Sequence, residues 1–97
     1  MKSALFRPAA AADLEEAALW YEAQRSGLGR EFLDAAEAAL KQVMANPKGY
    51  AVAYEDRRRL LLARFPYSLV YRLIGDDVVV IAVVHAKRNP RVWRSRV

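Results

Sequence analysis

Residues 65–85 read FPYSLVYRLIGDDVVVIAVVH and predict two β-strands joined by a tight turn. The strands are expected at residues 67–74 and 78–85, because both runs are rich in β-branched and aromatic side chains. The Gly-Asp-Asp of residues 75–77 is typical of a hairpin turn. Since the second run is apolar at successive positions, we expect this strand to be central in its sheet or covered on both faces.

The pairing of these two strands decides which side chains share a face of the sheet. If Ile74 pairs with Asp77, Arg72 and His85 lie on the same face. If Ile74 pairs with Val78 instead, they lie on opposite faces, because side chains alternate along a strand. A shift of one residue exchanges the two arrangements, and the sequence is compatible with both.

Two helices and a short strand are predicted upstream of the hairpin. Residues 10–24 are rich in the good helix formers Ala, Leu and Glu, and Pro8 suits a helix start. The Ser-Gly-Leu-Gly of residues 26–29 breaks this pattern, and a second helix is expected over residues 30–45. The short link favours an antiparallel helical hairpin. Residues 4–6 form a possible short strand before it.

The remaining strand is expected over residues 58–65, after the helix stop signal Asn-Pro-Lys-Gly at residues 46–49. The expected fold class is α+β: a short N-terminal strand, an antiparallel helical hairpin, and then a three-stranded antiparallel sheet. We assign residues 1–97 to a single domain, since this length supports one modest core. The following aromatic residues are expected to pack against the helices or in the core: Trp20, Tyr21, Phe32 and Tyr50.

The composition argues against several kinds of site. The chain has no cysteine, so it has neither a disulfide framework nor thiolate metal ligands. Metal-ligand spacings, glycine-rich phosphate loops and nucleophile triads are missing from the sequence, and we expect no metal or cofactor. The first residues lack a signal-peptide pattern, and the longest uncharged run, residues 78–86, is shorter than the roughly 20 residues of a membrane helix. We expect a cytoplasmic protein without membrane contact.

Basic residues gather in the second half of the chain. The net charge is +5, and residues 51–97 hold ten of the sixteen basic but only four of the eleven acidic side chains. Twelve of the sixteen are arginines, which favour bidentate contacts with carboxylates and phosphates. This asymmetry predicts an anionic partner, a nucleic acid or an acidic protein segment, unless the basic face is only solvated. The three arginines of residues 57–59 are expected to be solvated.

Several short motifs, in order along the chain, resemble those of one family of small proteins. They are Ala11-x-Asp13-Leu14, Trp20-Tyr21, Gly27-Leu28-Gly29-x-x-Phe32, Phe65-Pro66-Tyr67-x-Leu69-Val70-Tyr71-Arg72, Val80-Ile81-Ala82-Val83-Val84-His85-Ala86-Lys87-Arg88-x-Pro90, and Trp93. Their order and spacing resemble the RelE/ParE superfamily of bacterial type II toxins over nearly the whole chain. The resemblance implies a small basic toxin held inactive in a complex with an acidic antitoxin, which binds through a helix and an added strand.

The resemblance implies different targets for the two branches of this superfamily. RelE-like toxins cut mRNA in the ribosome, whereas ParE-like toxins poison DNA gyrase and have no established hydrolytic chemistry. As we align them, the nucleases place an arginine in the β-strand at the position of Ser68, and serine cannot hold a phosphate by charge. We therefore expect a ParE-like toxin that poisons gyrase by binding. The alternatives are a RelE-like, ribosome-dependent endoribonuclease and a degenerate toxin kept as a binding module.

The candidate site residues all lie in the second half of the chain. Residues expected to contact the antitoxin or the target are Arg64, Tyr71, Arg72, His85, Lys87, Arg88 and Trp93. In a nuclease, Arg64, Arg72, His85, Lys87 and Arg88 would supply charge and proton transfer. His85 is the only histidine, so a catalytic role must be weighed against a simple hydrogen-bonded imidazole at a strand end. Trp93 suits stacking or an interface as well as it suits burial.

Overall fold

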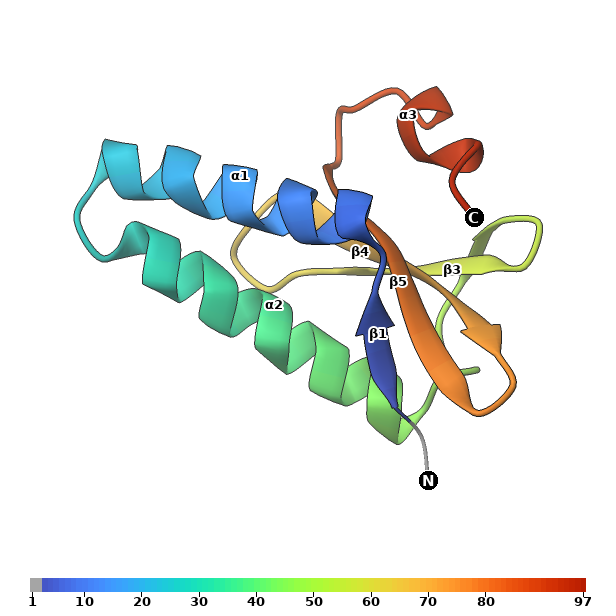
Figure 1. The fold of residues 1–97 in the computed structure, drawn as a ribbon. Helices are drawn as coiled ribbons and strands as arrows, with labels where there is room; N and C mark the ends of the chain where they lie inside the picture. The colour runs from blue at the N-terminus through green and yellow to red at the C-terminus, as the bar shows by residue number, and fades with distance from the viewer. Residues whose placement is uncertain (1–2) are drawn as a thin grey trace.

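The computed structural model of the chain describes residues 3–97. Its elements are β1 (Ala4–Phe6), α1 (Pro8–Gln24), α2 (Leu28–Ala45), β2 (Val52–Tyr54), β3 (Arg57–Leu61), β4 (Tyr67–Ile74), β5 (Asp77–His85) and α3 (Arg91–Arg94). The five strands form one sheet in the order β1-β5-β4-β3-β2, and α1 and α2 pack against one face (Figure 1). The predicted α+β fold class is therefore confirmed. Within the described residues, no helix is long and apolar enough to cross a membrane.

One carboxylate and two glycines hold the link between α1 and α2. Gly27 has φ 89°, a left-handed conformation that glycine adopts without strain. The Glu22 carboxylate accepts hydrogen bonds from the backbone N–H groups of Gly27 and Gly29, each at 3.0 Å. A Cβ atom on Gly29 would lie only 2.7 Å from the carbonyl oxygen of Ala18. The close approach of the two helices at this point therefore requires glycine.

Strands β4 and β5 form the predicted hairpin, and Ile74 pairs with Asp77. Gly75 in the connecting loop has φ 60°, which a tight hairpin turn requires. β5 lies between β1 and β4 in the sheet. The prediction that this apolar strand is central is therefore confirmed.

A bulge in β5 changes the side of the sheet on which its last residues lie. Tyr71 pairs with Val80 and Val70 pairs with Ala82, so Ile81 is an extra residue in β5. An extra residue of this kind reverses the alternation of side chains beyond it.

Arg72 and His85 consequently lie on opposite faces of the sheet. Tyr71 packs in the core beneath the helices, so its neighbour Arg72 is on the other face, where it contacts Asp56. His85 pairs with Tyr67, and both line a cleft beside α1. For the observed Ile74–Asp77 register, the sequence predicted that Arg72 and His85 share a face. This prediction is wrong, because the bulge lies between the two residues and cannot be read from the sequence.

Apolar side chains form a cluster on each face of the sheet. The larger cluster lies between the sheet and the two long helices and includes Phe32, Val43, Leu69, Tyr71, Val78 and Val80. The smaller cluster lies on the opposite face and comprises Val70, Ala82, Val84 and Trp93, with Ala53 and Tyr54 against it. The expectation of core packing holds for Phe32, Tyr21 and Tyr50. It is wrong for Trp20, which is 58% exposed because it lies beside the buried stripe of α1.

Three details of the second half differ from the expected arrangement. The sheet has five strands rather than three, because β1 pairs with β5 and β2 pairs with β3. The strand expected over residues 58–65 ends at Leu61, and the chain beyond it turns, with Arg64 at φ 71°. The short helix α3 and strand β2 were not predicted, since three or four residues are too few to show a periodic pattern.

Candidate functional site

The candidate cations do not converge on one point. Arg64 and Arg72 are each bound to a carboxylate in separate parts of the molecule, whereas His85, Lys87 and Arg88 lie at and just beyond the end of β5. Within residues 3–97, no ion pair engages the side chains of Lys87 and Arg88. These last three residues therefore form one candidate surface, and the two arginines belong to others.

Arg64 ties the β3–β4 loop to the helical hairpin. Its Nη2 lies 2.7 Å from Oε1 of Glu31, and Nη2 of Arg25 lies 3.0 Å from Oε2 of the same carboxylate. Hydrogen bonds from Arg64 and Arg25 hold the pKa of Glu31 below its ordinary value. The arrangement fixes the loop that precedes β4.

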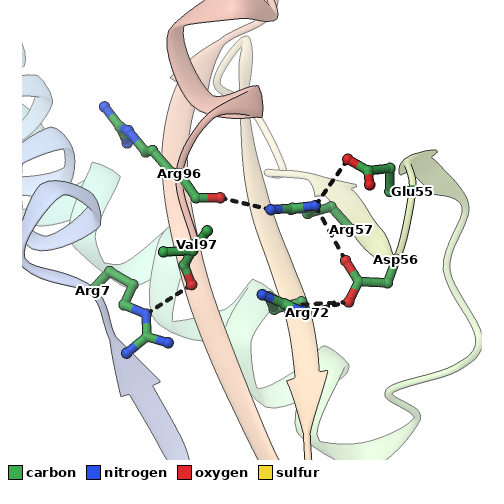
Figure 2. Close-up of polar contacts among 7 residues, drawn as sticks. All are labelled: Arg7, Glu55, Asp56, Arg57, Arg72, Arg96 and Val97. Atoms are coloured by element: carbon green, nitrogen blue, oxygen red, sulfur yellow. Dashed lines mark hydrogen bonds and ion pairs between the residues drawn. The ribbon is translucent and has the colours of Figure 1, made fainter.

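Arg72 and the buried Arg57 belong to a second polar cluster, which holds the C-terminal segment (Figure 2). Nε and Nη2 of Arg72 lie 3.1 and 2.8 Å from Oδ2 of Asp56. Nη2 of Arg57 donates a 2.8 Å hydrogen bond to the carbonyl oxygen of Arg96, and its Nη1 lies 3.4 Å from both Glu55 and Asp56. Arg57 was expected to be solvated, which is wrong because the C-terminal segment covers it.

Residues 91–97, which we call the tail, are anchored at further points. Trp93 is only 3% exposed and packs in the smaller apolar cluster. Nη1 of Arg96 lies 2.6 Å from Oδ2 of Asp13, which also accepts the backbone N–H of Val83 at 3.1 Å. Arg7 donates a 3.1 Å hydrogen bond to the carbonyl oxygen of Val97 (Figure 2). The anchoring roles of Asp13, Arg57 and Arg96 cannot be read from the sequence, because their partners are up to 83 residues away.

Two of the expected contact residues, Tyr71 and Trp93, are buried. Tyr71 is fully buried and donates a 2.6 Å hydrogen bond to the carbonyl oxygen of Pro47, and burial raises its pKa. Trp93 fills the space between the tail and the sheet. In this structure neither side chain offers surface to a partner.

Ser68 is also buried, on the face that the tail covers. It is 2% exposed, lies two residues before Val70 on β4, and pairs with Val84. Its hydroxyl oxygen has no hydrogen-bond partner among residues 3–97. The site is neither cationic nor open to solvent.

His85 lies in a cleft between the end of β5 and α1. Its Nδ1 accepts the backbone N–H of Lys87 at 3.0 Å, and its ring centroid is 5.2 Å from that of Tyr67. The remaining walls of the cleft include Asp13, Glu16, Trp20 and Arg88. Across the described part of the chain, no group of His, Asp and Glu side chains is arranged to hold a metal ion.

A separate apolar groove runs along the outer side of α1 and α2. It has a volume of about 560 Å³, and most of its lining is apolar, contributed by Phe6, Ala11, Leu14, Ala18, Leu19 and Leu33. Glu15, Glu22 and Arg30 also contribute to the walls. Leu19 is 64% exposed here. A concave, mostly apolar surface of this kind suits the apolar side of a binding partner.

Comparison with known proteins establishes the family. The family described as "ParE toxin of type II toxin-antitoxin system, parDE" matches residues 4–90. The chain belongs to the ParE toxin family. A chain from the solved chromosomal ParDE TA system of P. aeruginosa is similar to this ParE toxin, with a TM-score of 0.67 and 25% sequence identity. The similarity covers 88% of this chain and 96% of that chain. A search of curated proteins gives no match.

Proposed function

We propose that this ParE toxin is neutralised in the cytoplasm by an acidic antitoxin and, when released, poisons DNA gyrase by binding. The observation that carries the choice of gyrase over RNA is Ser68. RelE-like nucleases hold an arginine at this position, whereas here a small side chain is buried on the face that the tail covers. A phosphate at this point would meet a neutral hydroxyl in place of an arginine, at a buried position.

The distribution of cations supports the same choice. A nuclease that works by charge needs several cations aimed at one phosphate. Arg64 and Arg72 instead neutralise Glu31 and Asp56, and Arg72 pairs with Val79, toward the other end of the hairpin from His85. Binding of a protein target requires no such convergence.

A supercoiling assay with purified toxin and purified gyrase tests the proposed target. We expect loss of supercoiling and accumulation of cleaved plasmid, both reversed when the antitoxin encoded beside the toxin is added. Full gyrase activity at toxin concentrations that arrest growth would contradict the proposal, and cleaved mRNA on translating ribosomes would favour the nuclease alternative.

We place the antitoxin on two surfaces of the toxin. The groove along α1 and α2 suits the apolar side of an amphipathic helix. Exposed Lys87 and Arg88, neither of which has an ion pair within the described residues, suit an acidic segment. An antitoxin that carries both features would cover both surfaces.

Two substitutions of similar exposure test the groove. Leu19→Glu puts a charge into the groove and should weaken antitoxin binding by at least tenfold. Leu61→Glu, at a residue 58% exposed on β3, is the matched control and should leave the affinity near that of the wild type. Equal affinities of the two variants would exclude the groove.

For the basic segment, Lys87→Glu with Arg88→Glu should weaken antitoxin binding at low salt and less so at high salt.

A further inference from the structure

The cleft beside His85 has the composition of a binding site, and it shares only the basic residues Lys87 and Arg88 with the proposed antitoxin contacts. It has a volume of about 160 Å³ and lies between α1 and the end of β5. A larger hollow of about 510 Å³, formed by Trp20, Tyr21, Pro66, Tyr67 and His85, adjoins it. Trp20, Tyr67 and His85 line both spaces, so three aromatic rings border one continuous depression.

The exposed ring of Trp20 is held in place from below. It is 58% exposed, and its other side meets Tyr21 edge-on, with ring centroids 5.1 Å apart. Tyr21 is itself packed against Phe32 and Phe65 at 5.2 and 4.9 Å. An indole ring fixed by core residues and open to solvent on one side is a stacking surface that needs little ordering upon binding.

The polar groups on the walls of the cleft carry both signs of charge, since Glu16 and Arg88 both line it. Because Nδ1 of His85 accepts the Lys87 N–H, the neutral ring carries its proton on Nε2 and is a donor there. Glu16 lies on the α1 wall, and the neighbouring Asp13 is already engaged by Arg96.

The segment that follows His85 is strongly basic. The segment 86–97 has five basic residues and no acidic residue. Of these five, Lys87, Arg88 and Arg91 lie nearest to the cleft along the chain, all are exposed, and none has an ion pair among residues 3–97. Cations beside exposed aromatic rings are the arrangement that binds single-stranded nucleic acid.

We propose that this cleft binds single-stranded nucleic acid, with a base stacked on Trp20 and the adjoining phosphates on Lys87 and Arg88. Glu16 on α1 disfavours a phosphate beside it and accepts hydrogen bonds from base N–H groups, so the base lies toward α1 and the phosphates lie toward Lys87 and Arg88. The site is on the opposite face of the sheet from Ser68, and the proposal concerns binding alone, independent of gyrase and of RNA cleavage.

Titration of the purified full-length toxin with fluorescently labelled oligo(dT) and oligo(U) tests this site by anisotropy. Trp20→Ala should weaken binding about tenfold or more, and Trp20→Phe should retain most of the affinity because its ring still stacks. The matched control Leu61→Ala, at a residue on β3 that is 58% exposed like Trp20, should bind like the wild type.

Salt dependence provides a second readout that a structural role of Trp20 would not change. Replacement of both Lys87 and Arg88 by Gln should lower the slope of log K against log salt by about 1.4, since each phosphate contact contributes about 0.7 for single strands. The proposal is overturned if the toxin does not bind either oligonucleotide, or if Trp20→Ala binds them like the wild type. It is also overturned if an acidic peptide binds at Trp20 and the oligonucleotides do not.

Discussion

At the residue scale, the guanidinium group of Arg57 joins the start of β3 to the tail, 39 residues away in the sequence. It contacts Glu55 and Asp56 beside it and the carbonyl oxygen of Arg96 in the tail. Its Nε has no hydrogen-bond partner among the described residues, and its side chain is only 8% exposed. The guanidinium group of Arg57 therefore stabilises the tail through its hydrogen bond to Arg96, and the tail in turn shields this group from solvent.

Replacing Arg57 should therefore destabilise the protein far more than replacing its neighbour Arg59. Arg57→Ala removes the bond to the tail and leaves a cavity, and we expect a loss of about 1–3 kcal/mol in the free energy of unfolding. Arg59→Ala, at an exposed residue on the same strand, should change it by less than about 0.5 kcal/mol. Urea unfolding of both variants measures the difference, and equal losses would contradict the assigned role of Arg57.

Glu31 predicts a dependence of stability on acid pH. Its pKa is lowered in the folded state, first by the hydrogen bond from Arg64 and then by that from Arg25. The stabilisation is therefore complete above the ordinary pKa of 4.5 and is lost as the pH falls through the lower folded value. Unfolding should show the wild type more stable than Glu31→Gln at neutral pH, with the gap closing below pH 4.5. A gap that is constant with pH would contradict this assignment.

At the scale of elements, the smaller apolar cluster depends on the short helix α3. Trp93 supplies its largest side chain, and Tyr54 meets the indole ring edge-on at 6.3 Å. Arg94 lies over the ring of Tyr54, with its Cζ 4.7 Å from the ring centroid. The tail thus packs as a third layer on the face of the sheet that the long helices leave uncovered.

Removal of the indole ring should release the tail before the rest of the fold. Trp93→Ala should cost about 3–5 kcal/mol, as is usual for a buried tryptophan, and should increase hydrogen exchange across residues 91–97. Trp93→Phe should retain much of the protection. Unchanged exchange in the tail of Trp93→Ala would show that the polar anchors alone hold it.

The sequence predicts the long elements well because their patterns extend over many residues. Both long helices and the hairpin lie within two residues of their expected positions. The strand expected over residues 58–65 is longer than β3, because Leu62 and Phe65 are apolar core residues that lie in a loop and not in a strand. β2 was missed because it has only three residues.

The candidate site was harder to predict because it depends on contacts between distant residues. The bulge at Ile81 separates Arg72 from His85, and bulges have no local sequence signal here. The burial of Arg57 depends on a tail 39 residues away. Trp20 was assigned to the core by residue type, and only its position beside the stripe of α1 shows that it is exposed.

At the scale of the whole molecule, the two faces of the sheet have different properties. The helix side carries the apolar groove and the aromatic cleft, whereas the opposite face is closed by the tail over Ser68. Surfaces for partners are therefore available on the helix side. The opposite face, where the position of Ser68 would hold an arginine in a RelE-like nuclease, is covered by the tail. This asymmetry favours a toxin that works by binding.

Expression of the toxin without its antitoxin, with plasmid supercoiling and protein synthesis followed in the same culture, tests that conclusion most directly. We expect supercoiling to fall and cleaved DNA to accumulate within minutes, while mRNA stays intact and translation continues at first. Early arrest of translation with codon-phased mRNA cuts, before any change in supercoiling, would contradict the account and assign the toxin to RNA cleavage.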